Sequence, residues 1–565
     1  MISTEISKPV LPMWSRLHAW RAGLPKPTPW RMRTLHIPMR DGVRLGADLY
    51  TPVAPAKGVL LVAGPYGRGP LWSVSLARAF AGQKYTVLFA STRGTADSEG
   101  DLDPMRTDAQ DGHDIVTWMR EQPWYPGRFG TIGGSYLGYT QWALMSEPPA
   151  DLAAAVVTMG PHDFVRHTWG TGSFRFDLVG WGADVGVPDD PNPVRSMRAR
   201  AATRKQVDSV VEAVPVAPAA VEYFTGLGRA WMLPRLIHDD IDDPFYAPMR
   251  HADALEHSRV PTLLFAGWQD IFLAQSMRQY ERLRERGVDV ALTVGDWAHI
   301  DILLRGQPVI ASETLDWLDA HLAGQGRSSR RRPVRVAVGG SGRWLEERVW
   351  PPAGVATTTW YLHADGGLGE RVPAPDAASR AFVFDPARPT PTIGGNLISK
   401  GGRRDDSAYG TRRDVLVYDS APLRSDLWLS GVPRVSLDHA SERGDADLFL
   451  RLSDIDEKGR SRNVTEAYRR VRDAGTADIT LNDIAYVFRA GHRVRLIVAG
   501  GSFPQFSRNP GSGENPLVAE ILHPNRHEIR HRGGSSVLLL PIMPRELVAG
   551  LRPSASRDRS REELR

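Results

Sequence analysis

Cysteine is absent from the 565-residue chain. Its absence excludes disulfides, thiolate metal sites and cysteine nucleophiles together. The sequence also lacks any run that approaches the roughly 18 to 20 consecutive apolar residues of a membrane span. Residues 1–29 contain no apolar stretch followed by a small-residue cleavage site, so they do not match a secretory signal. We therefore expect a cytoplasmic protein without a membrane span, whose chemistry uses oxygen or nitrogen nucleophiles.

A large excess of either charge is also absent. The 70 basic and 65 acidic residues give a formal charge of +5, which is too dilute over 62.4 kDa to predict a nucleic-acid partner. The densest basic run, residues 327–335, follows a stretch rich in glycine and serine, which indicates a solvated linker. The expected partner is a small-molecule substrate. The sequence leaves the oligomeric state open, with a homodimer as one option.

Several domains are expected, because one hydrophobic core stops growing at roughly 250 to 300 residues. In the first third and again after residue 260, short apolar runs alternate with helical patterns, which predicts a parallel sheet with crossover helices. After the linker, many short alternating runs separated by turns are typical of a β sandwich or jelly roll. The predicted division is an N-terminal arm (1–33), an α/β-hydrolase domain (34–161 and 252–324), a helical cap (162–251), a linker (325–333), a β jelly-roll domain (334–551) and a flexible tail (552–565).

One serine has the surroundings of a nucleophile. In α/β-hydrolases the nucleophile lies on a sharp turn between a strand and a helix, where neighbouring glycines make room for the backbone. Ser135 follows a predicted strand, with Gly133 and Gly134 before it and Gly138 after it. The strict G-x-S-x-G pattern is not met, because the second glycine falls one position late. A glycine-rich turn without catalytic function is the alternative interpretation.

A serine nucleophile needs a base and an acid that orients the base. In this fold both follow the nucleophile in the sequence, at the carboxyl ends of later strands. Asp270 and His299 occupy such positions, because each follows one of the last two predicted strands of the sheet. Asp296 is the rival acid, although its place three residues before His299 better fits a local turn. The residues therefore predict a serine hydrolase with Ser135, Asp270 and His299 as its triad.

Several segments resemble one family of serine hydrolases. In chain order they include IPMRDGVRLGADLYTP, GPYGRG, STRGTADSEG, GGSYLGYTQW, VPTLLFAGWQD and GDWAH, and then FDPARPTPTIGGN and AGHRVRLIVAGGSFPQFSRNP in the last domain. The chain is similar to the CocE/NonD hydrolases, which include cocaine esterase, glutaryl-7-aminocephalosporanate acylase and α-amino-acid ester hydrolase and are related to the Xaa-Pro dipeptidyl-peptidases. The resemblance spans residues 34–545. The family pattern G-x-S-Y-x-G has its second glycine where Gly138 stands.

The resemblance implies hydrolysis of an ester or amide through an acyl-enzyme, with no cofactor and no metal. An Xaa-Pro dipeptidyl-peptidase is the alternative, and a noncatalytic binding protein is a more remote one. The family's triad maps onto Ser135, Asp270 and His299. Its oxyanion hole maps onto the hydroxyl of Tyr66 and the backbone N–H of Tyr136.

The acyl pocket is predicted from the same resemblance. Trp169, Trp181 and Phe272 stand where related esterases place aromatic residues around the acyl group, although they could equally belong to the core of the cap. If they line the pocket, an apolar or aromatic acyl group is favoured. Residues 271–273 are apolar, so a substrate ammonium would find no partner immediately after Asp270. Acids elsewhere in the cap could supply one; the candidates are Asp177, Asp184 and Asp239.

Overall fold

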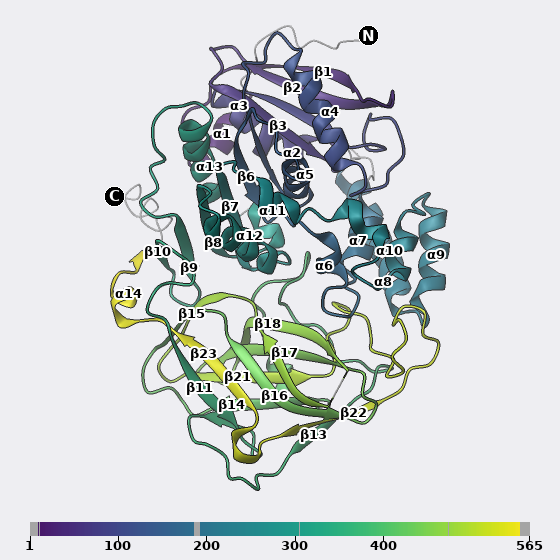
Figure 1. The fold of residues 1–565 in the computed structure, drawn as a ribbon, viewed down its shortest axis with the longest axis vertical. Helices are drawn as coiled ribbons and strands as arrows, with labels where there is room; N and C mark the ends of the chain where they lie inside the picture. Colours follow the sequence, from purple (N-terminus) through teal and green to yellow (C-terminus); the bar gives the residue numbers. More distant parts are fainter. Residues whose placement is uncertain (1–9, 11, 186–192, 304, 473, 554–565) are drawn as a thin grey trace.

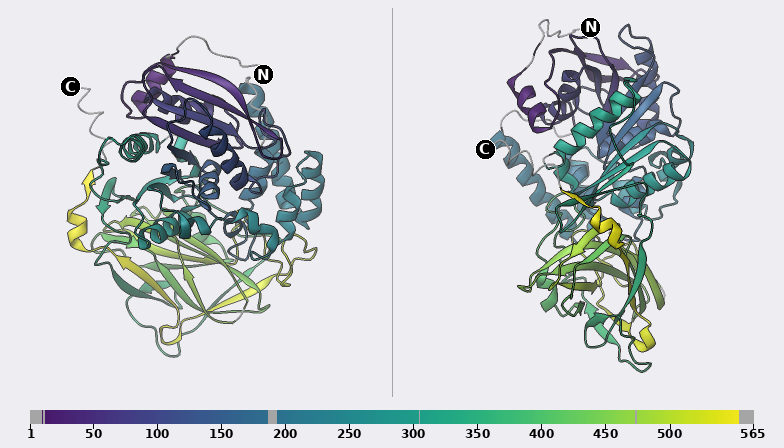
Figure 2. Two further views of the ribbon diagram at one scale, coloured as in Figure 1. Left: turned by 45° about the horizontal axis from the view of Figure 1, so that its top comes forward. Right: turned by 90° about the vertical axis from the view of Figure 1, so that its left-hand side faces the viewer.

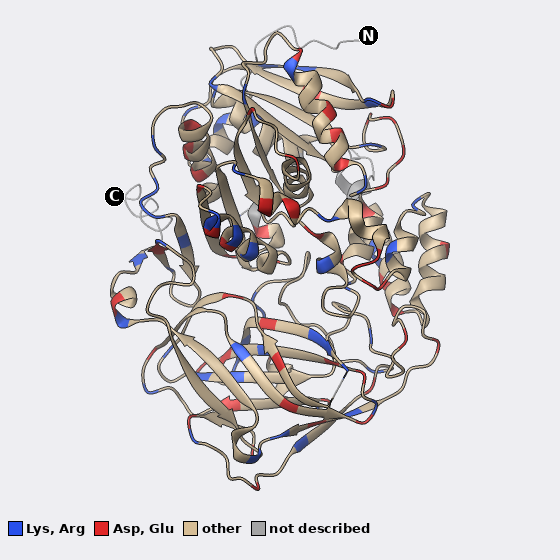
Figure 3. Cartoon of the chain, in the orientation of Figure 1, with Lys and Arg blue, Asp and Glu red and all other residues tan. Residues whose placement is uncertain are grey.

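The computed structural model describes residues 10, 12–185, 193–303, 305–472 and 474–553. An α/β domain and an all-β domain are stacked along the long axis of the molecule, and a group of helices inserted into the first domain lies at the side (Figures 1 and 2). This arrangement confirms the predicted fold class. Acidic and basic residues are interspersed over both domains (Figure 3).

The first domain is built on a sheet of 11 strands among the described residues. Its seven central strands are parallel, and antiparallel strands complete both edges. In spatial order the strands are β1 (Trp30–Pro38), β2 (Arg44–Pro52), β4 (Tyr85–Ser91), β3 (Gly58–Gly64), β5 (Phe129–Gly134), β6 (Leu152–Thr158), β7 (Thr262–Gln269), β8 (Val290–Ala298), β9 (Val334–Val338), β10 (Arg343–Glu347) and β24 (Arg552–Pro553).

Helices cover both faces of this sheet, which is why its central strands are apolar throughout rather than alternating. One face packs against α4 (Asp108–Arg120), α5 (Tyr136–Met145), α11 (Asp253–His257) and α12 (Leu273–Glu285). The other packs against α1 (Met13–Arg21), α13 (Gln307–His321) and a helical segment made of α2 (Pro70–Ser73), the π turn η1 (Val74–Arg78) and α3 (Ala79–Gly82). A short 3-10 turn, η3 (His299–Leu303), follows β8.

Three segments that were predicted to lie outside the hydrolase domain contribute strands to this sheet. Residues 552–553, assigned to the tail, form β24, which pairs with β10. Residues 30–33, assigned to an arm, begin β1, which pairs with β2 along its whole length. Residues 334–347, assigned to the jelly roll, form β9 and β10, and β9 lies parallel to β8. Val334, Val336 and Val338 are buried in the core of the hydrolase domain. A short strand with alternating apolar residues has the same pattern in either sheet, so the pattern alone could not assign it.

The inserted helices lie between β6 and β7. They enclose an apolar cluster that includes Phe174, Val179, Phe224 and Met232. The elements are α6 (Phe164–Thr168), α7 (Asp177–Asp184), α8 (Pro193–Glu212), α9 (Val216–Gly226), α10 (Met232–Ile237) and the 3-10 helix η2 (Pro244–Met249). We call this insertion the cap.

In the part of the chain that the structure describes, the second domain contains 13 strands, of which only β12 and β14 pair in parallel. Its core consists of alternate residues of the strands, as Leu448, Leu450 and Leu452 of β17 illustrate. The strands are β11 (Ala356–Leu362), β12 (Gly367–Gly369), β13 (Arg380–Phe384), β14 (Val415–Ser420), β15 (Leu427–Gly431), β16 (Arg434–Ser441), β17 (Ala446–Ile455), β18 (Ser461–Val471), β19 (Gly475–Thr480), β20 (Ile484–Phe488), β21 (Arg493–Ala499), β22 (Asn525–Arg530) and β23 (Val537–Ile542). Its short helices are η4 (Ser407–Thr411), η5 (Arg532–Gly534) and α14 (Arg545–Ala549).

The cap is fastened to the β domain through the loop between α6 and α7. The Ser173 hydroxyl donates to Asp447 at 2.7 Å, and the backbone N–H of Phe174 donates to the Ser507 hydroxyl at 3.1 Å. Because these polar groups are buried, removal of either partner would destabilise the fold by about 1 to 3 kcal/mol.

Among the described residues, no helix has the length and apolar character needed to cross a membrane.

Candidate active site

Ser135 lies at the sharp turn between β5 and α5. Its backbone has φ 57° and ψ −124°, a conformation that costs a non-glycine residue roughly 1 to 3 kcal/mol. The backbone N–H of Ser135 donates to the carbonyl of Thr158 at 2.9 Å, and its own carbonyl accepts from the N–H of Tyr139 at 3.0 Å. The strained turn is therefore held by the neighbouring strand and by the first turn of α5.

Two glycines make this turn possible. A Cβ atom on Gly133 would lie 2.7 Å from the carbonyl oxygen of Leu137, and one on Gly138 would lie 2.7 Å from the Cα of Gly160. Both distances are too short for carbon contacts, so neither position accepts a side chain. Gly138 is required because α5 passes directly over the chain that leaves β6, which explains why the second glycine falls three residues after the serine.

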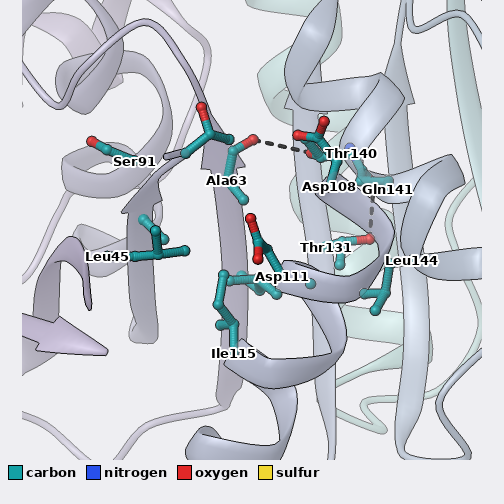
Figure 4. Close-up of a pocket in the computed structure, with 14 residues that line it drawn as sticks. Leu45, Ala63, Ser91, Asp108, Asp111, Ile115, Thr131, Thr140, Gln141 and Leu144 are labelled. Atoms are coloured by element: carbon teal, nitrogen blue, oxygen red, sulfur yellow. Dashed lines mark hydrogen bonds between the residues drawn. The ribbon is translucent and has the colours of Figure 1, made fainter. Parts of the chain in front are cut away.

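Side chains behind the turn fix α5 to the sheet (Figure 4). The Thr140 hydroxyl donates to the carbonyl of Ala63 in β3 at 3.0 Å, and the Thr131 hydroxyl of β5 donates to the Gln141 side chain at 2.8 Å. These bonds are largely screened from water, so they orient the helix that carries the nucleophile.

A chain of hydrogen bonds joins the three predicted triad residues. Nε2 of His299 lies 3.0 Å from Oγ of Ser135, and Nδ1 of His299 lies 2.6 Å from Oδ1 of Asp270. The other carboxylate oxygen of Asp270 accepts from the backbone N–H of Phe272 at 2.8 Å. Asp270 is fully buried and His299 is 7% exposed. The distances fit proton transfer from serine to histidine, with the carboxylate fixing the orientation of the ring.

Strand ends position the acid and the base. Asp270 directly follows β7 and His299 directly follows β8, so the parallel neighbours bring both side chains to one edge of the sheet. Gln269, the last residue of β7, is held by the β domain: its amide donates to the Val464 carbonyl at 2.7 Å and accepts from Asn463 at 2.9 Å. The partner of Nδ1 of His299 is Asp270 rather than the rival Asp296.

Tyr66 follows β3 and faces the nucleophile. Burial raises the pKa of its phenol above the ordinary value, against hydrogen bonds with Ser135, Trp181 and the backbone of Tyr136, which lower it. The phenol therefore keeps its proton at neutral pH and can donate it. Since Tyr136 is the first residue of α5, its backbone N–H is among those at the helix start without an intrahelical partner. Both predicted oxyanion donors thus converge beside Ser135.

The side chain of Tyr136 is held by a residue that the sequence analysis missed. Its hydroxyl donates to Asp108 at 2.8 Å and accepts from the backbone N–H of Met105 at 2.7 Å. Burial, followed by the nearby charge of Asp111, raises the pKa of Asp108 to about 7, although the bond from Tyr136 opposes this. Asp108 is the first residue of α4, a position where an acid is common, so nothing in the sequence marked it as a neighbour of the active site.

Aromatic rings surround the triad on the cap side. Phe272 packs edge-on against His299 with ring centroids 5.5 Å apart, and it also contacts Phe164 at 5.7 Å. Trp181 stacks on Tyr136 at 5.6 Å, and its indole N–H donates to the Tyr66 hydroxyl at 3.2 Å. The structure therefore brings Trp181 and Phe272 to the site and adds Phe164, which no sequence pattern singled out.

Trp169, the third residue predicted for the pocket, has other neighbours. Its ring packs on Phe174 at 5.0 Å and its N–H donates to the carbonyl of Arg235 at 3.1 Å. It also borders a groove of about 960 Å³ between the cap and the β domain, beside Tyr468, and the triad does not border this groove. These contacts correspond to the core of the cap, the alternative interpretation of this residue.

The buried acid of the cap already has partners within the protein, one of them the cationic Arg175. Asp177 lies 2.8 Å from a guanidinium nitrogen of Arg175 and 3.5 Å from Nε2 of His167. Although burial opposes its ionisation, these two neighbours lower the pKa of Asp177 to about 2. Its charge is therefore compensated within the protein, which makes it a poor partner for a substrate ammonium.

Solved structures share this fold over almost the whole chain. An α-amino acid ester hydrolase labelled with selenomethionine superposes with a TM-score of 0.78 at 20% identity, covering 95% of this chain and 99% of the other. A CocE/NonD family hydrolase from Staphylococcus aureus gives a TM-score of 0.67 at 16% identity, over 92% and 94% of the two chains. At these identities the likeness establishes the fold alone.

The fold and the hydrogen-bonded serine, histidine and aspartate define a serine hydrolase of the α/β-hydrolase class. Residues 41–301 match the X-Pro dipeptidyl-peptidase (S15 family), and residues 327–538 match the X-Pro dipeptidyl-peptidase C-terminal non-catalytic domain. Cocaine esterase of Rhodococcus sp. (strain MB1 Bresler) is 28% identical over 570 residues, which cover 90% of this chain and 98% of that protein. The chain is therefore similar over almost its whole length to serine hydrolases of the CocE/NonD type.

Proposed function

We propose that this protein is a carboxylesterase that cleaves small-molecule esters with apolar or aromatic acyl groups, with Ser135 as nucleophile, His299 as base and Asp270 as the orienting acid. The observation that carries the proposal is the hydrogen-bond chain from Asp270 through His299 to Ser135, at the edge where β7 and β8 end. The names of the relatives, a cocaine esterase and two putative serine esterases, support it.

In the first half of the reaction, Oγ of Ser135 attacks the acyl carbon while its proton passes to Nε2 of His299. The carbonyl oxygen becomes an oxyanion, which the Tyr66 hydroxyl and the Tyr136 N–H would stabilise. The bond to the leaving alcohol then breaks, and that alcohol takes the proton from His299. Asp270 stabilises the imidazolium that exists between the two transfers.

In the second half, water takes the place of the alcohol. His299 removes a proton from the water, the hydroxyl attacks the acyl carbon, and the proton passes to Oγ of Ser135 as the acid leaves. The Tyr66 hydroxyl and the Tyr136 N–H would stabilise the oxyanion in both halves of the reaction. Each such donor is worth roughly two to three orders of magnitude in kcat in a comparable enzyme.

The acyl preference rests on the aromatic rings at the site. Phe272, Phe164 and Trp181 present ring surfaces next to His299 and Tyr66. Burial of an apolar group against such surfaces contributes about 25 cal/mol for each Å² removed from water. We therefore expect benzoyl esters to react with higher kcat/KM than acetyl esters of the same alcohol.

An X-Pro dipeptidyl-peptidase is the second candidate, because the family match to the first domain carries that name. It would require a site for the free amino terminus of the substrate. The compensated charge of Asp177 and the apolar residues 271–273 argue against such a site. Release of nitroaniline from a Gly-Pro nitroanilide, faster than hydrolysis of benzoyl esters, would favour the peptidase.

A fluorophosphonate probe tests the proposed function directly. It should label Ser135 and abolish ester hydrolysis, and Ser135→Ala should be neither labelled nor active. Ser341→Ala is the matched control, since the Ser341 hydroxyl makes local turn contacts: it donates to the carbonyl of Val338 and accepts from the backbone N–H of Arg343. Folded wild-type protein that is not labelled and does not hydrolyse esters would refute the proposal.

We further propose that the protein acts in the cytoplasm, as its sequence led us to expect.

A further inference from the structure

A tryptophan of the cap donates a hydrogen bond to the phenol proposed for the oxyanion hole. Nε1 of Trp181, in α7, lies 3.2 Å from the hydroxyl oxygen of Tyr66, which follows β3. An indole N–H can only donate, so the Tyr66 oxygen must be the acceptor. A phenol has a single proton. Because Trp181 approaches from one side, the Tyr66 proton turns away from the indole.

The groups near Tyr66 determine where that proton can go. Its oxygen is within hydrogen-bonding reach of Ser135 and of the Tyr136 backbone N–H as well as of Trp181. Of these neighbours, the Tyr136 N–H and the Trp181 N–H are donors and repel another proton. The side of Ser135, where the oxyanion forms, is therefore the direction that remains for the Tyr66 proton.

Ring packing keeps both partners in place. The Trp181 indole stacks on the Tyr136 ring at 5.6 Å and 11°, and the Tyr66 ring stacks on Trp72 at 4.8 Å and 13°. Because the stacked surfaces oppose rotation of either ring, the hydrogen bond between them has little freedom to reorient.

We propose that Trp181 is a positioning residue, which turns the Tyr66 hydroxyl proton toward the oxyanion and so makes the cap part of the oxyanion hole. The inference rests on the proposed function and deepens it. A residue that only lines the acyl pocket would contribute mainly to substrate binding, so its replacement would change KM. A residue that orients an oxyanion donor acts only as negative charge develops, and therefore changes kcat.

Trp181→Phe separates these roles, because phenylalanine keeps an aromatic ring and lacks the N–H. With a phenyl ester as substrate, we expect kcat to fall about three- to tenfold while KM changes less than twofold. The affinity for phenylboronic acid, whose serine adduct is tetrahedral, should fall by a similar factor. A change confined to KM, or no change in either constant, would contradict the proposal.

A double-mutant cycle provides the decisive measurement. Tyr66→Phe removes the hydroxyl that Trp181 orients, so adding Trp181→Phe to it should cause no further loss of kcat. The same three- to tenfold loss in both backgrounds would mean that Trp181 acts by packing, and would overturn the proposal. Circular dichroism and thermal unfolding of all four proteins would establish that each is folded.

Trp231→Phe is the matched control. It also removes an indole N–H from the cap next to Trp181, but Trp231 makes no hydrogen bond to Tyr66 among the contacts described. Its kcat should equal that of the wild type, and a loss equal to that of Trp181→Phe would contradict the proposal. If the wild type hydrolyses esters and is labelled at Ser135 but the cycle shows no coupling, the positioning role fails while the proposed function stands.

Discussion

The two halves of this active site are built differently. Ser135, Asp270 and His299 all come from the hydrolase domain, each directly after a parallel strand. The groups opposite them come from several parts of the chain: Tyr66 from the loop after β3, Trp181 from the cap and Phe272 from the turn after the acid. The first group, which we call the triad half, depends on sheet topology. The second, which we call the pocket half, depends on how separate layers pack.

This difference predicts which substitutions should lower activity most. A triad residue is held by a strand end and by direct hydrogen bonds, so its replacement should remove chemistry without disturbing the fold. A residue of the pocket half works through packing and indirect contacts. Its replacement should alter substrate preference or stability by smaller amounts.

The largest effect should separate the two acids near His299. Asp270→Asn should lower kcat by about four orders of magnitude, because the histidine would lose the carboxylate that fixes its tautomer. Asp296→Asn, the matched control, should keep kcat within about threefold. Steady-state kinetics on a benzoyl ester would measure both. Comparable losses of kcat in the two variants would contradict the assignment of Asp270, rather than Asp296, as the acid that orients His299.

A smaller effect should change substrate preference. Phe272→Leu leaves intact the backbone N–H that binds Asp270, so the triad keeps its support. It removes the ring packed on His299, and kcat/KM for a benzoyl ester should fall about tenfold relative to that for the acetyl ester. Trp169→Phe should leave this ratio unchanged. Equal losses for both esters would show that Phe272 supports the triad rather than the acyl group.

The smallest effect concerns stability and its dependence on pH. The pKa of Asp108 is raised to about 7 in the folded protein and is about 3.9 in an unfolded chain. Its ionisation therefore opposes folding increasingly as the pH rises from about 4 to about 7, and fully above that range. Asp108→Asn removes this cost, so the Tm of the variant minus that of the wild type should be more positive at pH 8 than at pH 4.5. An equal difference at both values would show that Asp108 does not titrate in this range.

Much of the triad half could be predicted from the sequence because it follows from local order along the chain. Parallel strands and the glycines around Ser135 have recognisable patterns, and the ends of neighbouring strands must meet. The sheet that β9 joins could not be predicted in this way: its alternating valines are compatible with either sheet, and only tertiary pairing with β8 decides.

The pocket half could not be predicted to the same extent. Trp169 and Trp181 have similar sequence surroundings, yet Trp181 reaches Tyr66 while Trp169 packs on Phe174. Which ring turns toward the site depends on the packing of α6 and α7, and no short pattern encodes that. The contact of Asp108 with Tyr136 joins positions 28 residues apart and arises only when α4 and α5 pack together.

The attachment of the cap loop at Ser173 and Phe174 to the β domain has a consequence for the order of biosynthesis. Translation proceeds from the amino end, so Ser135, Asp270 and His299 leave the ribosome well before Asp447 and Ser507, which receive that loop. A nascent chain therefore carries its reactive serine before the surface that anchors the cap exists. We expect the growing polypeptide to stay inert toward esters until its last domain has emerged and folded.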